Sequence, residues 1–195
     1  MSDALIVVDV QNDFCPGGAL PVPDGDRVVP VLNTYLARAD AAGMPIFASR
    51  DWHPARTTHF TEFGGRWPAH CVQDTPGAAF HPDLRLPAAT RIITKGTGGR
   101  DEGYSAFEGQ LSDGRDLATA LGEAGVTRVF VGGLATDYCV RATVLAARQA
   151  GFEVTWLRDA SRPVDMKPGD GARAQIEMMA AGACEGALQD FTPAS

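Results

Sequence analysis

An acid, an amine and a thiol each stand close to the end of a strand that the sequence predicts. They are Asp9, Lys95 and Cys139. A free thiol has a pKa of about 8.5 and is mostly protonated at neutral pH, so it needs help to act as a nucleophile. A helix that begins at Cys139 would favour the thiolate by only about 0.3–1 kcal/mol. Asp9 can accept the thiol proton and Lys95 can stabilise the anion, so together the three residues predict a nucleophilic centre.

The same three residues also have ordinary structural interpretations. A carboxylate at a strand end often forms a turn. An isolated cysteine commonly packs as a small hydrophobic side chain, and a lysine after a strand is commonly solvated. Position alone therefore leaves both interpretations open.

A second group of candidates lies in a segment that holds all four histidines of the chain. Asp51 and His53 are two residues apart, so their side chains point to the same side of an extended chain. His59 and His70 follow. Carboxylate and imidazole ligands suit Zn, Fe or Mn, and the paired cysteines of a structural zinc site are absent. Cys71 adjoins His70 but points the other way on an extended chain. The alternative is that the histidines cluster by chance.

Short apolar runs alternate with helical patterns, which is typical of an α/β fold with a mostly parallel sheet. We expect strands at residues 4–9, 45–49, 91–94, 127–132, 152–157 and 186–188, and helices at 26–42, 117–124, 138–150 and 172–181. The segment 51–87 has little periodicity, and loops of this length in compact domains are commonly functional. Ligands of open parallel sheets bind beyond the carboxyl ends of the strands, so Asp9, Lys95 and Cys139 should converge there.

Length and charge narrow the class of protein. The 195 residues fit a single domain over residues 1–195 with one core, built as three layers. With 17 basic and 24 acidic residues the net charge is −7, which argues against a nucleic-acid partner. No apolar run approaches the ~20 residues of a membrane span. With no signal-peptide pattern either, and with four scattered cysteines, we expect a cytoplasmic protein without a membrane partner.

Motifs along essentially the whole chain resemble one family. They are DVQNDFCPGGAL at 9–20, DWHP at 51–54, WPAHCVQDTPGA at 67–78, Lys95-Gly96, YSAF at 104–107 and GLATDYCV at 133–140. In this order they are similar to the nicotinamidases, the metal-bearing branch of the isochorismatase-like cysteine hydrolases. One departure from the family pattern is the acidic pair Asp101-Glu102 in the loop before Tyr104.

The resemblance implies a role for particular residues. The catalytic Asp, Lys and Cys of the family fall on Asp9, Lys95 and Cys139. The backbone N–H groups of Ala135 and Cys139 would form an oxyanion hole, next to a cis peptide bond between Leu134 and Ala135.

The resemblance also implies one divalent metal ion, zinc first and iron or manganese as alternatives. Its ligands fall on Asp51, His53 and His70, and some members add a histidine at the position of His59. The aromatic residues that contact the substrate ring fall on Phe14, Trp67 and Tyr104.

The implied activity is that of an amidohydrolase acting on linear amides. Nicotinamide would be hydrolysed to nicotinate and ammonia through a thioester on Cys139, as a step of NAD salvage. One alternative is hydrolysis of another small amide, such as a carbamoyl compound. The other is a non-catalytic metal-binding or redox protein. The sequence leaves open the native metal, the activity on pyrazinamide and whether the chain forms a homo-oligomer.

Overall fold

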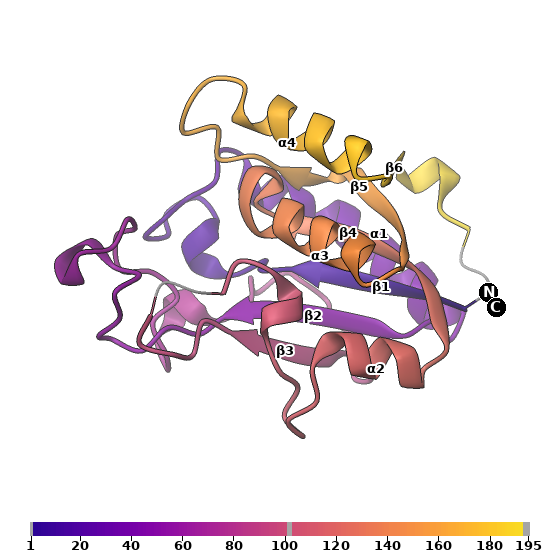
Figure 1. Cartoon of the computed structure of the whole chain (residues 1–195), viewed down its shortest axis with the longest axis horizontal. Helices are drawn as coiled ribbons and strands as arrows, with labels where there is room; N and C mark the ends of the chain where they lie inside the picture. Colours follow the sequence, from indigo (N-terminus) through magenta and orange to yellow (C-terminus); the bar gives the residue numbers. More distant parts are fainter. Residues whose placement is uncertain (1, 101–102, 193–195) are drawn as a thin grey trace.

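A sheet of six strands, all of them parallel to their neighbours, forms the centre of the molecule (Figure 1). The computed structural model describes residues 2–100 and 103–192, so the acidic pair at 101–102 lies outside the described residues. Across the sheet the strands are β3 (Arg91–Lys95), β2 (Ile46–Asp51), β1 (Ser2–Val8), β4 (Val126–Leu134), β5 (Glu153–Arg162) and β6 (Cys184–Gly186). The strand order reverses at β1, so the ends of β1 and β4 frame the expected ligand crevice.

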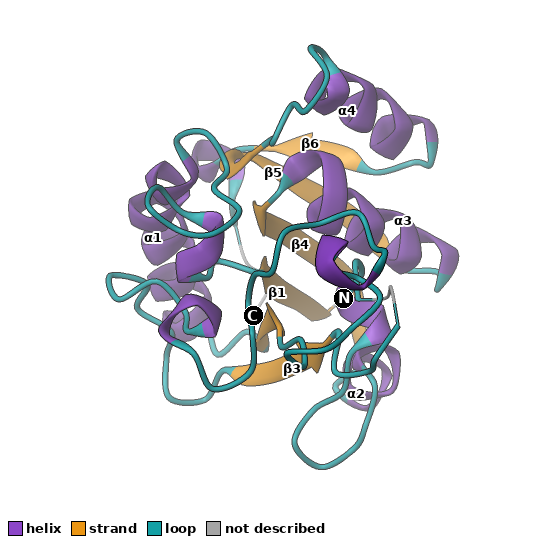
Figure 2. Cartoon of the chain, turned by 90° about the vertical axis from the view of Figure 1, so that its left-hand side faces the viewer, coloured by secondary structure: helices purple, strands orange, loops and turns teal. Residues whose placement is uncertain are grey.

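Helices cover both faces of the sheet and complete three layers (Figure 2). One face carries α1 (Val28–Ala41), and the other carries α2 (Leu117–Glu123), α3 (Arg141–Gln149) and α4 (Asp170–Ala180). Successive residues of β1 pack into different cores, because side chains alternate across a strand. Val7 belongs to the core with α1, whereas Ile6 and Val8 belong to the core with the other three helices. Because both faces of the strand are buried, its sequence is a continuous apolar run.

The predicted strands and helices are all present, with three differences. Strand β5 continues five residues beyond its predicted end, through a polar stretch that pairs with β4 after a register shift. The predicted helix at 138–150 starts earlier, as a π-helical turn (Thr136–Val140) that leads into α3. In this turn the N–H of Val140 donates to the carbonyl of Ala135 at 3.1 Å. The sixth strand was predicted at 186–188 and lies at 184–186.

Long connections gather beyond the carboxyl ends of the strands, at the left of Figure 1 and toward the viewer in Figure 2. The segment between β2 and β3 contains only short 3₁₀ turns and isolated bridges, as expected for the predicted long loop. Within the described residues, no helix is long and apolar enough to cross a membrane.

Candidate active site

The structure brings the predicted acid, amine and thiol together beyond the carboxyl ends of three strands. Asp9 directly follows β1, Lys95 is the last residue of β3, and Cys139 lies in the π-helical turn after β4. The Nζ atom of Lys95 is 2.7 Å from Oδ2 of Asp9 and 3.7 Å from Sγ of Cys139. All three side chains are buried, so their mutual charges are only weakly screened by water.

Lys95 is surrounded by oxygen acceptors. Besides Asp9, its ammonium pairs with Asp51 and donates to the carbonyl of Gly103. Burial alone would lower the pKa of Lys95, but the two carboxylates outweigh it and raise the pKa well above its usual value. Lys95 therefore stays charged throughout the neutral range.

Asp9 is held in a left-handed turn, with φ of 49°, at the end of β1. Its Oδ1 accepts a hydrogen bond from the hydroxyl of Ser49 at 2.7 Å. Burial raises the pKa of Asp9 to about 6, and the Lys95 ammonium offsets only part of this rise. A carboxylate with this pKa can accept a proton and return it near neutral pH.

Cys139 rests as a thiol. Burial raises its pKa well above the usual value, and the negative charges of Asp9 and Asp51 add to the rise. The Lys95 ammonium lowers the pKa of Cys139 but does not compensate for burial. A thiol with a raised pKa would act as a nucleophile only by losing its proton to a nearby base, and Asp9 could serve as that base.

Three imidazoles form a cluster next to this centre. Ligand atoms of His53, His59 and His70 all lie within 4.8 Å of one another, and all three side chains are buried. Nδ1 of His53 donates to the carbonyl of Gly96 at 3.0 Å, and Nδ1 of His70 donates to the carbonyl of Pro68 at 2.7 Å. These bonds fix the tautomer that leaves each Nε2 lone pair free for a metal.

The donor set fits a divalent metal ion. Nε2 of His53 is buried and has no hydrogen-bond partner among the described residues, which is costly unless something binds it. Burial lowers the pKa of His70 to about 4, so this ring is neutral at physiological pH, the form that ligates a metal.

Asp51 connects the two clusters. One of its oxygens pairs with Lys95, and Oδ2 lies 3.6 Å from Nε2 of His53. Burial tends to raise the pKa of Asp51, but Lys95 and His53 hold it below its usual range, so the group is ionised. The fourth histidine, His81, lies outside the imidazole cluster. Cys71 is buried in the core beside α1 and also lies outside it.

One cavity is lined by Cys139 of the triad and by His59 and His70 of the imidazole cluster. Cys139 and Ala135 form part of its wall, as do the predicted ring contacts Phe14, Trp67 and Tyr104. The indole N–H of Trp67 donates to the hydroxyl of Tyr104 at 2.8 Å. The Leu134–Ala135 peptide bond is cis, as expected from the resemblance. Sequence reasoning missed five wall residues, namely Leu20, Val22, Gly103, Tyr138 and Val164.

Gln11 is a buried residue of the first motif to which sequence reasoning gave no role. Its carboxamide pairs with the backbone of Asp51 like a peptide group, since Oε1 accepts from the N–H of Asp51 at 2.7 Å and Nε2 donates to its carbonyl at 2.8 Å. Nε2 also donates to the carbonyl of Ala78 at 2.8 Å. Gln11 therefore fixes the backbone that carries the carboxylate shared by Lys95 and His53.

Two further carboxylates hold loops of the site in place. Asp13 accepts hydrogen bonds from the N–H groups of Ala19 and Cys71, which ties the first loop to the residue after His70. Asp137 accepts from the N–H groups of Val164 and Asp165, both at 2.9 Å. Both acids lie inside the quoted motifs, but Cys71, Val164 and Asp165 are distant from them in sequence, so only the fold could reveal these links.

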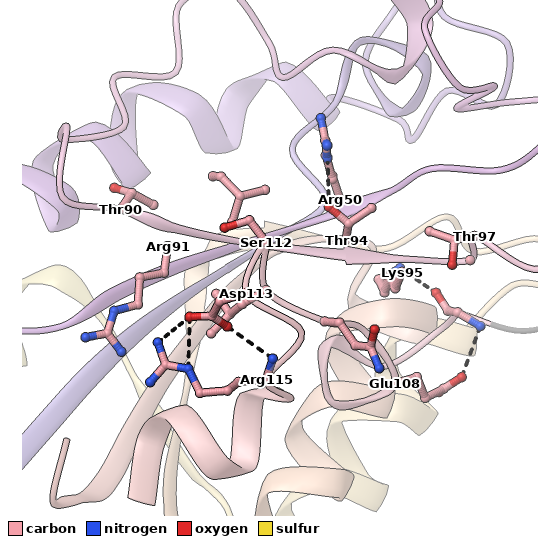
Figure 3. Close-up of a pocket in the computed structure, with 15 residues that line it drawn as sticks. Arg50, Thr90, Arg91, Thr94, Lys95, Thr97, Glu108, Ser112, Asp113 and Arg115 are labelled. Atoms are coloured by element: carbon pink, nitrogen blue, oxygen red, sulfur yellow. Dashed lines mark hydrogen bonds and ion pairs between the residues drawn. The ribbon is translucent and has the colours of Figure 1, made fainter. Parts of the chain in front are cut away.

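Another cavity, of about 1130 Å³, lies along the outer edge of β3 and lacks this chemistry (Figure 3). Its lining contains no histidine or cysteine. Arg115 is paired with Asp113 and Glu123, and Arg50 donates to the hydroxyl of Thr94. Lys95 borders this cavity, but its ammonium is held by the two buried carboxylates. The predicted nucleophile Cys139, with His59 and His70, lines the smaller cavity instead.

Comparisons with known proteins identify the family of the chain. The family model described as the isochorismatase domain matches residues 3–188. The chain belongs to the isochorismatase family. The nicotinamidase of Escherichia coli (strain K12) is 40% identical over 207 residues, which cover 96% of each chain.

Solved structures of this family extend the comparison. The pyrazinamidase of Pyrococcus horikoshii in complex with zinc is 49% identical with a TM-score of 0.89, covering 96% of this chain and 100% of that one. PnC1 from L. infantum in complex with nicotinate is 33% identical with a TM-score of 0.86, covering 98% of this chain and 95% of that one. The predicted isochorismatase-like α/β fold is confirmed.

Proposed function

We propose that this protein is a nicotinamidase, which hydrolyses nicotinamide to nicotinate and ammonia. One observation carries the proposal: Cys139 of the Asp9–Lys95–Cys139 centre and His59 and His70 of the imidazole cluster line one cavity with aromatic walls. The nucleophile can attack the carboxamide of nicotinamide, and a metal ion held by the imidazoles can bind its basic ring nitrogen. The similarity to nicotinamidases over nearly the whole chain supports the same substrate.

In the proposed reaction Asp9 accepts the thiol proton while Sγ of Cys139 attacks the carboxamide carbon. The N–H groups of Ala135 and Cys139 stabilise the oxyanion; loss of one such donor commonly costs about 3–4 kcal/mol. Asp9 then gives its proton to the departing ammonia, which leaves a thioester on Cys139. A water molecule that transfers a proton to Asp9 hydrolyses the thioester, releases nicotinate and restores the thiol.

The ammonium of Lys95 stabilises the negative charge at each of these steps. Its ammonium stands between the base and the nucleophile, at 2.7 Å from Asp9 and 3.7 Å from Cys139. As the negative charge moves from Asp9 toward sulfur and the carbonyl oxygen, the cation remains close to both positions. It also keeps Asp51 ionised beside His53.

The imidazoles of His53, His59 and His70, with Asp51 alongside, would hold a divalent ion, and zinc is the metal we propose. The zinc complex of the pyrazinamidase relative supports this choice. When bound, the ion supplies a Lewis-acid site for the ring nitrogen and so orients the carboxamide toward Cys139.

The reduced nucleophile fits a cytoplasmic enzyme, which is the location we propose. All four cysteines are free, and Cys139 must remain a thiol to react. The net charge of −7 fits a small-molecule substrate rather than a nucleic-acid or membrane partner.

Ammonia release from a panel of amides tests the proposal. The zinc-loaded protein should act on nicotinamide with a higher kcat/KM than on carbamoyl compounds or aliphatic amides. Preference for a carbamoyl compound would assign the site to another small-amide hydrolase. No ammonia from any amide would favour a metal-binding or redox protein instead.

A further inference from the structure

A second cavity adjoins the substrate pocket, and Tyr138 lines both. This outer cavity has a volume of about 330 Å³ and lies between the π-helical turn and the segment that leads into α4. Arg66, Met166 and Lys167 border it, and none of them borders the inner pocket. The side chain of Tyr138 is therefore the partition between two spaces.

The two ends of Tyr138 have different neighbours. Its ring packs edge-on against Trp67 at a centroid distance of 5.0 Å and stacks with Tyr104 at 6.5 Å, both of which line the inner pocket. Its hydroxyl accepts from Arg66 at 3.2 Å and donates to the sulfur of Met166 at 3.5 Å, both of which line the outer cavity. The ring thus closes the inner pocket, and the hydroxyl is held by residues of the outer cavity.

The inner pocket by itself is too small for an aromatic ring. Its volume is about 40 Å³, whereas a cavity of roughly 150 Å³ holds benzene. A wall must move when a ring enters. Phe14 and Trp67 are buried, while Tyr138 is only partly buried and has the outer cavity behind it. Displacement of Tyr138 joins the two spaces.

The outer cavity has a surplus of positive charge. Its acids are already engaged: Asp137 by two backbone N–H groups, Asp170 by Arg173 and Glu177 by Arg141. In contrast, the side chains of Arg66 and Lys167 form no ion pair within the described parts of the chain. Two cationic side chains that lack a carboxylate partner among the described residues, next to a substrate pocket, favour an anionic group.

We propose that the outer cavity is a second subsite, which takes an anionic substituent on the pyridine ring once Tyr138 moves aside. The inference rests on the proposed function, because it uses the orientation of nicotinamide. With the ring nitrogen toward the imidazoles and the carboxamide toward Cys139, carbon 5 of the ring points away from both. A short carboxylate chain at carbon 5 is the substituent that would reach Arg66 and Lys167.

The test compares kcat/KM, measured as ammonia release, for three substrates. These are nicotinamide, 5-(2-carboxyethyl)nicotinamide and its neutral analogue 5-(3-hydroxypropyl)nicotinamide. Tyr138→Ala should raise kcat/KM for both substituted amides relative to nicotinamide by about tenfold or more, the scale on which pocket size discriminates substrates. Tyr138→Leu, which keeps apolar packing against Trp67, should shift the ratio in the same direction. Tyr138→Phe keeps the ring and should keep the wild-type ratio.

The charge of the subsite is tested separately. Arg66→Gln should lower the preference for the carboxylate over the hydroxyl analogue by about two- to fivefold, the size expected of a solvent-exposed ion pair. The matched control is Arg158→Gln, which removes an exposed arginine that pairs with Glu185 and lines neither cavity, and it should leave every ratio unchanged.

Two results would overturn the subsite while leaving the function intact. In one, the Ala, Leu and wild-type proteins give the same ratio of substituted amides to nicotinamide. In the other, Tyr138→Phe shifts this ratio as far as Tyr138→Ala does. Failure of the wild-type protein to release ammonia from nicotinamide would instead overturn the proposed function and the subsite together.

Discussion

The Sγ atom of Cys139 lies 3.7 Å from the Nζ atom of Lys95, yet the thiol keeps its proton at rest. The main reason is burial, which raises the pKa of the thiol, and the negative charges of Asp9 and Asp51 add to the rise. Lys95 lowers the pKa but does not compensate, and its ammonium also faces the two carboxylates. In the proposed mechanism, reactivity then depends on transfer of the thiol proton to Asp9 during attack. This relationship separates the site from one that holds a permanent thiolate.

Replacing the nucleophile should abolish turnover without loss of zinc or of nicotinamide binding. Cys139→Ala should lower kcat by at least about 10³-fold, because loss of a residue that acts as part of a unit removes nearly all of its catalysis. Zinc content by metal analysis and nicotinamide binding by calorimetry should stay close to wild type, because Sγ lies outside the imidazole cluster. Near-normal turnover in this variant would remove Cys139 from the mechanism.

The raised pKa of Asp9 predicts an acid limb in the pH profile. Asp9 must be ionised to accept the thiol proton, and its pKa is raised to about 6. As the pH falls below this value the protonated fraction rises, so kcat/KM should fall about tenfold for each further pH unit. Measurement of kcat/KM for nicotinamide between pH 4.5 and pH 8 (roughly the range that brackets this pKa) tests the limb.

The variant that removes this titration is Asp9→Asn. Residual activity in Asp9→Asn should be very low and should lack the limb. If the wild-type profile stayed flat down to pH 5 (about one unit below the pKa), the acid–base role of Asp9 would have to be abandoned.

The framework of the fold was predictable because its signals are local. Apolar runs for buried strands, glycines after helices and the alternation of the two patterns lie within short windows of sequence. The end of β5 was missed for the opposite reason. Its residues from Arg158 to Arg162 are mostly polar, and they become a strand only because a register shift lets them pair with β4.

The residues of the site also fall into two groups, those that the sequence could predict and those that it could not. Asp9, Lys95 and Cys139 could be found because strand ends converge in a parallel sheet and because their motifs resemble a family. The roles of Gln11 and Asp137 could not, since each acts through backbone groups of distant segments. The position of Tyr138 between two cavities could not be predicted from the sequence either, because it depends on the cavities that both border this residue.

Gln11 should contribute to both stability and metal binding. In Gln11→Leu the N–H of Asp51 and the carbonyls of Asp51 and Ala78 lose their buried partner. Each buried group left unpaired costs about 1–3 kcal/mol, so urea unfolding of the metal-free protein should show a loss of about 3 kcal/mol or more.

Zinc affinity should also fall in Gln11→Leu, because the backbone under Asp51 is no longer fixed. The matched control is Gln73→Leu, which removes one partly buried bond to the carbonyl of Trp52 and should cost about 1 kcal/mol. Equal losses for the two variants would contradict the special role of Gln11.

His59 can be tested as a ligand against the histidine outside the cluster. His59→Ala should weaken zinc binding by at least about tenfold, because even supporting residues of metal sites contribute this much. His81→Ala removes the imidazole that lies apart from the other three and should leave zinc affinity unchanged. Competition with a chromogenic chelator measures both. Equal zinc affinity in the two variants would exclude His59 from the site.

The ring nitrogen of the substrate should matter only when the metal is present. Benzamide has the shape and the carboxamide of nicotinamide but no ring nitrogen, so it forms the contact with Cys139 and lacks the one at the imidazoles. A carbonyl misplaced by ~1 Å can cost about 100-fold in rate, so kcat/KM for benzamide should be about 100-fold below that for nicotinamide in the zinc-loaded protein. Removal of zinc with a chelator should lower the nicotinamide value and shrink this ratio toward one, and adding zinc back should restore it. Equal rates on the two amides with zinc bound would assign the metal a structural role and remove the ring nitrogen from substrate recognition.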